Sequence, residues 1–138
     1  MSQTNELEIM ERIALDLERV EESLASSFNT GAEDFNALIR PLSAAGGKRL
    51  RAQLCLLIAN AGTSIERQRI KIAEAVEMLH LATLIHDDVL DQAEIRRGED
   101  TIHMHKGNKV AILSGDYLFA KAFKIVSEMT NMKYLQVF

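Results

Sequence analysis

The feature that most constrains the fold of this chain is a helical spacing of apolar residues that continues through most of its length. From Leu7 to Leu24, apolar side chains recur every three or four positions with charged residues between them, as in an amphipathic helix. The 138 residues contain one proline and seven glycines, too few for the regularly spaced turns of a sheet protein. The sequence therefore predicts an all-α fold, with residues 1–138 forming a single helical domain.

Breaks in this spacing divide the chain into expected helices. They run from Leu7 to near Gly31, over 33–40 where Pro41 ends the helix, over 48–61, over 65–90 and over 109–129. Ser64 is a partial N-cap signal for the helix over 65–90. Residues 91–108 are polar and contain Gly98 and Gly107, so we expect a loop there with at most a short helical piece.

Composition excludes several classes of protein. The net charge of -4 argues against binding nucleic acid through a positive field, so no nucleic-acid partner is expected. The single cysteine, Cys55, excludes an intramolecular disulfide and a cysteine-rich zinc site. No apolar run approaches the roughly 20 residues of a membrane span, and the N-terminus lacks a secretion signal. We therefore expect no integral membrane segment and a reducing, cytoplasmic location.

An acidic cluster near the end of the expected helix over 65–90 is the sharpest chemical feature. Asp87 and Asp91 lie one turn apart on one helix stripe, and Asp88 flanks that stripe. The three carboxylates repel one another and oppose the helix dipole, and no lysine or arginine stands one turn earlier on the stripe. Carboxylate oxygens at this spacing suit Mg²⁺, which adds water and phosphate oxygens to its shell. The cluster therefore predicts magnesium binding, and a solvated acidic helix end is the alternative.

Two basic clusters supply a phosphate partner for such a metal. Residues 46–51 open a helix with two glycines, and Lys48 and Arg51 are expected on one face of it. Arg96 and Arg97 follow the aspartates closely enough to reach the same phosphate. Either cluster alone is typical of a solvated surface. Together with the aspartates, they indicate two separate diphosphate groups.

At this point the motifs match a family. Four of them stand in order: Gly46-Gly47-Lys48-Arg49-Leu50-Arg51, then Glu77-Met78-Leu79-His80 leading into Leu84-Ile85-His86-Asp87-Asp88-Val89-Leu90-Asp91, then Arg96-Arg97-Gly98, then Gly115-Asp116-Tyr117-Leu118. In order and spacing they resemble the trans-isoprenyl diphosphate synthases, the polyprenyl synthetase family. The resemblance covers about residues 30–130 and implies an antiparallel helix bundle of the isoprenoid synthase type around a deep apolar tunnel.

The resemblance also implies a role for each motif. Asp87 and Asp91 would bind Mg²⁺ directly, Asp88 would support the cluster, and Arg96 would complete the catalytic set by holding the diphosphate of an allylic substrate. The diphosphate of isopentenyl diphosphate would be held by Lys48, Arg51, His80 and Arg97. The implied reaction is ionisation, condensation and proton loss, giving a longer trans-polyprenyl diphosphate. The family usually forms homodimers through helices that include the one bearing Phe119 and Phe123.

Some features depart from the family pattern. No second aspartate-rich motif follows Asp91, Ala52 stands where a proline is usual, and Gln92 stands where a further aspartate is common. The apolar tail over 134–138 carries no stop signal. We therefore expect the N-terminal part of a synthase, about the first half of the fold. We also expect this chain to be inactive or nearly so on its own.

Residues one turn before Asp87 are implied to set the length of the product. Ala82 and Thr83 are small where bulky aromatic residues would close the tunnel early, and Leu79 lies deeper. This favours a medium- or long-chain product, beyond farnesyl. Ala82→Phe in a full-length enzyme is expected to shorten that product.

Two rival interpretations remain open. His86 and Asp87 also form the doublet of all-α metal-dependent phosphohydrolases of the HD type, with His80 and Asp91 as further ligands. That interpretation leaves Gly46-Gly47-Lys48 unexplained. The other rival is a non-catalytic partner subunit of a heteromeric prenyl synthase, although such partners usually lack the aspartate motif.

Two further features are interpreted as structural. His103 and His105 have the spacing of a zinc or nickel pair, but histidines in a polar loop are more typically solvated. Asp116 is expected to make a structural hydrogen bond between helices.

Overall fold

A computed structural model describes residues 3–44, 47–62 and 65–129 and confirms the all-α fold. In chain order the elements are α1 (Gln3–Ser27), α2 (Glu33–Ala44), α3 (Leu50–Ala61), α4 (Glu66–Leu90), β1 (Ile95–Arg96), β2 (Glu99–Asp100), α5 (Ile102–Lys106) and α6 (Asn108–Ser127). Within these residues, no helix has the length and apolar character that crossing a membrane requires. The predictions made for Gly46, Ser64 and 134–138 fall outside the described residues.

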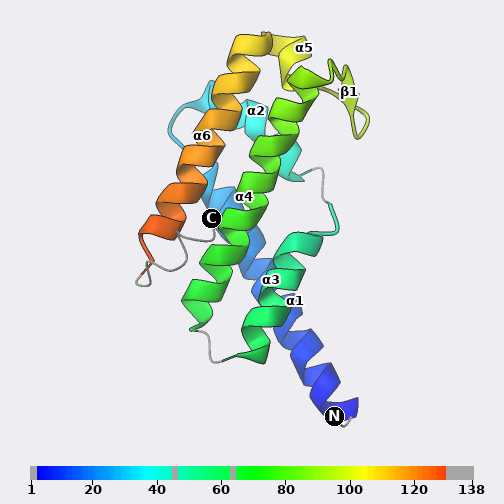
Figure 1. Cartoon of the computed structure of the whole chain (residues 1–138), viewed down its shortest axis with the longest axis vertical. Coiled ribbons are helices and arrows are strands. Elements are labelled where there is room, and N and C mark those ends of the chain that lie inside the picture. The colour runs from blue at the N-terminus through cyan, green and yellow to red at the C-terminus, as the bar shows by residue number, and fades with distance from the viewer. Residues whose placement is uncertain (1–2, 45–46, 63–64, 130–138) are drawn as a thin grey trace.

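Helix α4 is the centre of the arrangement and packs against α1, α3 and α6. Figure 1 shows α1 and α4 running in one direction while α3 and α6 run in the other, so the bundle is antiparallel as expected. The β1–β2 hairpin and α5 lie at the end of the bundle where α4 ends (Figure 1). The acidic cluster at the end of α4 and the arginines of the hairpin therefore belong to the same end of the molecule.

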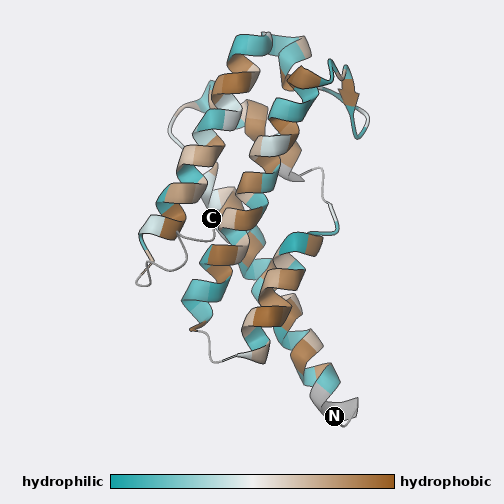
Figure 2. Cartoon of the chain, viewed as in Figure 1, coloured by the Kyte–Doolittle hydropathy of each residue, from teal (hydrophilic) through white to brown (hydrophobic). Residues whose placement is uncertain are grey.

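The core is built from the inward stripes of the long helices. Val20 and Leu24 of α1, Met78 of α4 and Leu118 of α6 are fully buried, as the spacing of apolar residues predicts. The first turns of α1 are different, since Leu7 is 64% exposed although it continues the same stripe. In Figures 1 and 2 this part of α1 extends past the neighbouring helices, so it has no partner to bury it among the described residues.

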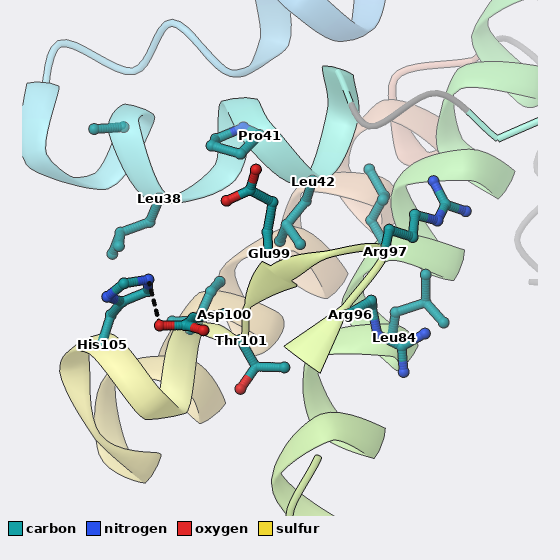
Figure 3. A pocket seen from close by; sticks show the side chains of 13 residues that line it. Leu38, Pro41, Leu42, Leu84, Arg96, Arg97, Glu99, Asp100, Thr101 and His105 are labelled. Atoms are coloured by element: carbon teal, nitrogen blue, oxygen red, sulfur yellow. Dashed lines mark ion pairs between the residues drawn. The ribbon is translucent and has the colours of Figure 1, made fainter. Parts of the chain in front are cut away.

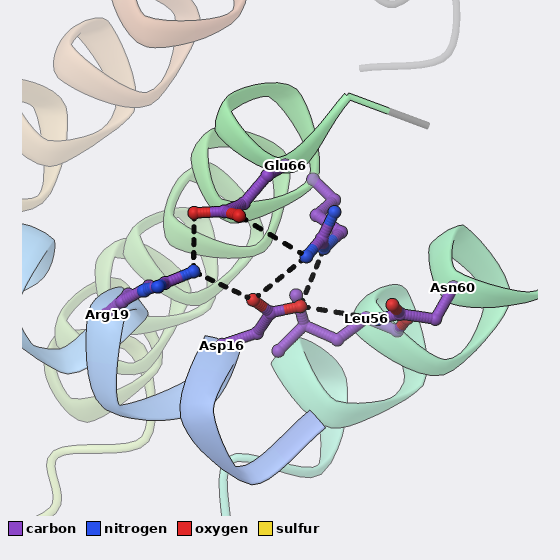
Figure 4. Close-up of polar contacts among 6 residues, drawn as sticks. Asp16, Arg19, Leu56, Asn60 and Glu66 are labelled. Atoms are coloured by element: carbon purple, nitrogen blue, oxygen red, sulfur yellow. Dashed lines mark hydrogen bonds and ion pairs between the residues drawn. The ribbon is translucent and has the colours of Figure 1, made fainter. Parts of the chain in front are cut away.

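Buried charges join α1, α3 and α4. Asp16, which is 1% exposed, accepts hydrogen bonds from Arg69 Nε (2.6 Å) and Nη2 (3.1 Å) and from Asn60 Nδ2 (3.3 Å). Arg19 pairs with both Asp16 and Glu66 (Figure 4). A buried carboxylate is costly unless it is paired, so this network fixes how the three helices meet.

Pro41 does not end α2, which continues to Ala44. A proline inside a helix removes the hydrogen bond to the carbonyl four residues earlier, here that of Ala37. Ala37 and Pro41 are both exposed, so water can replace the missing donor. The expected end of this helix at Arg40 was therefore wrong.

Two other boundaries differ from the expectation for a local reason. Helix α3 begins at Leu50, because Arg49 adopts a left-handed backbone conformation with φ 45°. The segment 91–108 contains the short helix α5, as expected, but also the hairpin, which was not expected. Its two turn residues, Arg97 and Gly98, have φ 55° and 87°. Two successive positive φ values are the pattern of a tight type I′ hairpin turn.

Candidate functional site

A basic pocket lies between the start of α3 and the middle of α4. Its lining includes all four side chains that the sequence predicted for one diphosphate, namely Lys48, Arg51, His80 and Arg97. The predicted reason for their proximity was partly wrong, because Lys48 precedes α3 and does not share a helix face with Arg51. The left-handed turn at Arg49 places both residues at the pocket instead.

The pKa of His80 reflects the positive charges around the pocket. Burial lowers the pKa of His80, and the positive charges of Arg51, Arg97 and Arg96 lower it further, while Glu77 opposes them. A neutral imidazole surrounded by guanidinium groups can accept a proton when an anion enters. The electrostatics of the pocket therefore suit a multiply charged anion.

Arg97 reaches the pocket through a close approach to Gly47. A Cβ atom on Gly47 would stand 3.1 Å from Arg97 Nη2, which is tighter than an ordinary contact. A Cβ at position 47 would therefore require the exposed guanidinium of Arg97 to shift by a few tenths of an ångström. The first glycine of residues 46–51, Gly46, falls outside the described residues.

Sequence reasoning assigned no role to two further residues that line the pocket, Arg49 and Glu77. Arg49 is turned inward, with Nε 2.5 Å from Glu21 Oε1 and Nη1 3.5 Å from Glu77 Oε2. Burial opposes the charge on Arg49, but the hydrogen bonds and charges of Glu21 and Glu77 outweigh it and raise the pKa of Arg49. Glu77 also accepts a hydrogen bond from Ala52 N (3.0 Å). Only the tertiary structure separates this buried arginine from its exposed neighbours Lys48 and Arg51.

The acidic cluster divides into two exposed carboxylates and one buried carboxylate. Asp87 and Asp91 are exposed and remain one helical turn apart, with Asp91 N donating to Asp87 O at 2.8 Å. Neither here nor elsewhere in the described residues are three or more His, Cys, Asp or Glu side chains grouped so that they could hold a metal ion. Two carboxylates with open surroundings fit Mg²⁺, which commonly takes one or two protein ligands and fills its shell with water and phosphate oxygens.

Asp88 is 4% exposed and belongs to a different interaction. Its Oδ1 accepts hydrogen bonds from Arg96 Nε (2.8 Å) and forms an ion pair with Arg96 Nη2 (2.7 Å). The hydrogen bond to Asp88 raises the pKa of Arg96 despite partial burial. The helix stripe of Asp87 and Asp91 has no lysine or arginine one turn earlier. The positive charge that compensates the acidic cluster comes instead from Arg96 of the hairpin. Asp88 supports the cluster by holding Arg96 beside Asp87 and Asp91.

A second, more apolar pocket lies on the other side of the hairpin, against α2. Leu38, Pro41 and Leu42 of α2 face Leu84 of α4 across it, and Arg96, Arg97 and Asp100 line its rim (Figure 3). Arg97, Leu81 and Leu84 line both pockets, so the two adjoin.

The residues predicted to set product length line neither of these pockets. Ala82 is fully buried in the core, and Leu79 and Thr83 are half-buried. Thr83 Oγ1 donates to the backbone oxygen of His80 at 2.7 Å. Because Ala82 has no free space, a phenylalanine there would disturb the core, whereas position 83 is partly open.

His86 is directed away from Asp87 and toward α6. Its Nε2 lies 3.1 Å from Ile112 O and 3.3 Å from Asp116 Oδ1, and its ring stacks on Phe119. Asp116 therefore makes the expected contact between helices. An HD-type phosphohydrolase would need His86 and Asp87 on one metal, and this geometry contradicts that rival interpretation.

The loop histidines also do not converge. His103 Nδ1 lies 3.0 Å from Thr101 Oγ1, and His105 Nε2 pairs with Asp100 at 3.7 Å (Figure 3). Each ring thus has its own partner on or next to the hairpin, which agrees with their interpretation as non-ligands.

Comparison with known proteins agrees with this geometry. Residues 32–138 match the family model described as Polyprenyl synthetase. The chain is 33% identical over 135 residues to "Solanesyl diphosphate synthase 1, chloroplastic" from Arabidopsis thaliana, covering 94% of this chain and 33% of that protein. It is 33% identical over 129 residues to "Octaprenyl diphosphate synthase" from Escherichia coli (strain K12), covering 94% of this chain and 40% of that protein.

Among solved structures, a polyprenyl synthase from Caulobacter crescentus CB15 superposes with a TM-score of 0.86 at 36% identity. The match covers 94% of this chain and 39% of that one, whose structure holds calcium and isoprenyl diphosphate. The chain thus spans only about 33–40% of the length of these relatives. These relatives are prenyl or polyprenyl synthases, and none of them supports the phosphohydrolase or partner-subunit alternatives.

Proposed function

Because the chain belongs to the polyprenyl synthetase family, we propose that it forms the substrate-binding wall of a prenyltransferase. The proposed enzyme condenses an allylic prenyl diphosphate with isopentenyl diphosphate to give a longer trans-polyprenyl diphosphate. The observation that carries this proposal is the basic pocket, where side chains from three separate segments converge on one site. The printed names of the curated relatives support the same chemistry.

The two diphosphates take different residues in this proposal. Isopentenyl diphosphate is bound by Lys48, Arg51, His80 and Arg97 in the basic pocket. The allylic diphosphate is bound by Arg96 beside Asp87 and Asp91. Figure 3 shows the side chains of Arg96 and Arg97 leaving the hairpin in different directions, which supports one arginine for each diphosphate.

A divalent metal, which we propose to be Mg²⁺, fits the exposed pair Asp87 and Asp91. When bound, it neutralises charge that develops on a departing diphosphate. Arg96 is held by Asp88 through one edge of its guanidinium, and the rest of the group remains available to the same diphosphate. These residues hold the leaving group in place, which favours cleavage of the allylic carbon–oxygen bond.

The basic pocket holds the second substrate by its diphosphate, so that its double bond can be presented to the allylic carbon. The carbon–oxygen bond to the allylic diphosphate breaks, a carbon–carbon bond forms with isopentenyl diphosphate, and a proton leaves. The released diphosphate is the proposed acceptor of that proton. His80, whose pKa is lowered by burial and by the neighbouring arginines, gains a proton most readily when a diphosphate occupies the pocket.

Three finer features belong to this proposal. The product is longer than farnesyl, which the printed names of the solanesyl and octaprenyl relatives support. The enzyme works as a homodimer, for which the partly exposed apolar residues of α6, such as Leu113 and Phe123, provide a surface. The setting is cytoplasmic, in keeping with the free thiol of Cys55.

Binding of inorganic diphosphate to this chain tests the proposal. Isothermal titration is expected to show binding without metal, and Lys48→Ala or Arg51→Ala should weaken it about tenfold by removing one charged contact. Added Mg²⁺ should tighten binding further, and Asp87→Asn should abolish that increment. Arg67→Ala is the matched control, because Arg67 is exposed at the other end of α4. An unsubstituted chain that binds no diphosphate, with or without Mg²⁺, would contradict the proposal.

A further inference from the structure

Glu77 is an acidic residue that lines a pocket otherwise built for anions. It is 3% exposed and stands three residues before His80 on α4, so the two share a helix face. A negative charge in this place opposes binding of a diphosphate through space. The presence of Glu77 is explained if its contacts have a favourable effect on the pocket that exceeds this repulsion.

The contacts of Glu77 have such an effect. One carboxylate oxygen accepts the backbone N–H of Ala52, one of the unsatisfied donors in the first turn of α3. The other lies 3.5 Å from Arg49 Nη1, while Glu21 of α1 holds the opposite edge of the same guanidinium at 2.5 and 3.1 Å. Glu77 thus joins α4 to both the start of α3 and the left-handed residue that precedes it.

Lys48 and Arg51 depend on this joint for their position. They flank Arg49 along the chain, and Arg49 adopts a backbone conformation that costs a non-glycine residue free energy. The side-chain bonds of Arg49 to Glu21 and Glu77 compensate for that cost. If they are lost, the turn can relax, and the two exposed cations on either side move with it.

We propose that Glu77 is a positioning residue for the diphosphate pocket, which acts through Ala52 and Arg49 to hold Lys48 and Arg51 at the anion. The inference rests on the proposed function, since the anion that the pocket binds is taken to be a diphosphate. Glu77 itself does not touch the anion in this view. By positioning the two cations, Glu77 strengthens binding of the anion, whereas its negative charge alone would weaken it.

Glu77→Gln tests the proposal, because the amide keeps the shape and can still accept from Ala52 but no longer pairs ionically with Arg49. We expect inorganic diphosphate to bind about tenfold more weakly, the size of one lost charged contact. The dependence of affinity on salt should also become shallower, because fewer cations then meet the anion. A residue that only stabilised the fold would leave the salt dependence unchanged.

Glu74→Gln is the matched control. Glu74 is fully buried on the same helix, one turn earlier, and accepts from Ser23, Ser27 and Lys71 rather than from groups at the pocket. It should lower the melting temperature without changing diphosphate affinity. If Glu77→Gln does not fold, Arg49→Lys tests the same joint, since a lysine cannot bridge Glu21 and Glu77 in the same way.

The outcomes separate the inference from the function on which it rests. Weaker binding in Glu77→Gln, with normal binding in Glu74→Gln, supports the positioning role. Equal or tighter binding in Glu77→Gln overturns it, because charge alone predicts tighter binding on loss of the carboxylate. If Glu77→Gln does not fold, weaker binding in Arg49→Lys supports the positioning role and equal or tighter binding overturns it. If the unsubstituted chain binds no diphosphate, the proposed function fails first and this inference fails with it.

Discussion

At the scale of single residues, neighbouring side chains of one type have different environments and therefore different uses. Lys48 and Arg51 are exposed at the basic pocket, whereas Arg49 between them is buried and paired with two glutamates. Asp87 is exposed, whereas Asp88 beside it is held by Arg96. The chemistry of each motif therefore depends on which of its residues the backbone turns outward.

The pH dependence of His80 is the prediction that belongs to this scale. Its pKa in the folded chain lies below the usual 6.5 because of burial and the nearby arginines. Between the folded pKa and 6.5, the unfolded chain binds more protons, so the contribution of His80 to the free energy of unfolding rises with pH across that window. Bound diphosphate should raise the pKa of His80, because its negative charge favours the protonated imidazole. As the pH rises through this raised pKa, His80 loses its proton and its contribution to diphosphate affinity should fall.

NMR titration of the imidazole of His80, with and without inorganic diphosphate, measures both values. In His80→Gln, the pH dependence assigned to this residue should disappear from both stability and binding. A pKa that stays in place when diphosphate saturates the pocket would contradict the prediction.

At the scale of elements, the junction of α4 with α6 fixes the helix that carries the acidic cluster. His86 of α4 lies directly against Gly115 of α6, where an added Cβ would stand 2.3 Å from His86 Nε2. No real Cβ contact is so short, so the His86 ring lies in this position against α6 only because residue 115 is glycine. This explains Gly115 in the fourth motif by packing, with Asp116 adding a polar contact to the same ring.

Gly115→Ala is therefore expected to reduce the free energy of unfolding by about 1–3 kcal/mol, the usual cost of overpacking a well-packed site. Urea denaturation measures this loss. In a chain that also carries His86→Ala, the clash is absent and the cost of Gly115→Ala should nearly vanish. An equal cost in both backgrounds would show that the close approach to His86 does not explain the glycine.

At the scale of the whole molecule, the described residues would provide one side of the proposed reaction site. The end of α4, which carries the acids, and the hairpin, which carries Arg96, lie at one end of the bundle (Figure 1). The basic pocket adjoins them between the start of α3 and the middle of α4. The curated relatives are longer, and this chain spans about 33–40% of their length. The proposed metal site consists of two exposed carboxylates, and no third His, Cys, Asp or Glu of the described part is placed to hold a metal with them.

We therefore expect this 138-residue chain to bind diphosphate but to show no measurable turnover of farnesyl diphosphate with isopentenyl diphosphate. The chain matches only about 33–40% of the length of its curated relatives, so the part of the proposed site that the rest of a relative supplies is missing from this chain. Product analysis with labelled isopentenyl diphosphate measures turnover, with the octaprenyl diphosphate synthase of Escherichia coli as the positive control. Polyprenyl product formed by the chain alone would refute this expectation.

The sequence by itself determined the helical class, the approximate extent of the four long helices and four residues of the basic pocket, namely Lys48, Arg51, His80 and Arg97. These follow from local periodicity and from motifs whose spacing is independent of tertiary contacts. It did not predict the hairpin, although Arg97-Gly98 carries a weak signal for a two-residue turn. It also missed the continuation of α2 past Pro41, which depends on exposure of the carbonyl at Ala37.

Only the tertiary structure decided which charges are buried and which remain available. Arg49 was distinguished from Lys48 and Arg51 by Glu21 and Glu77, which lie 28 residues away on either side along the chain. A buried charge persists only where a partner of opposite charge compensates its loss of hydration. Partners so distant in sequence meet only after the helices pack, which is why the local pattern could list the charged residues but could not assign them.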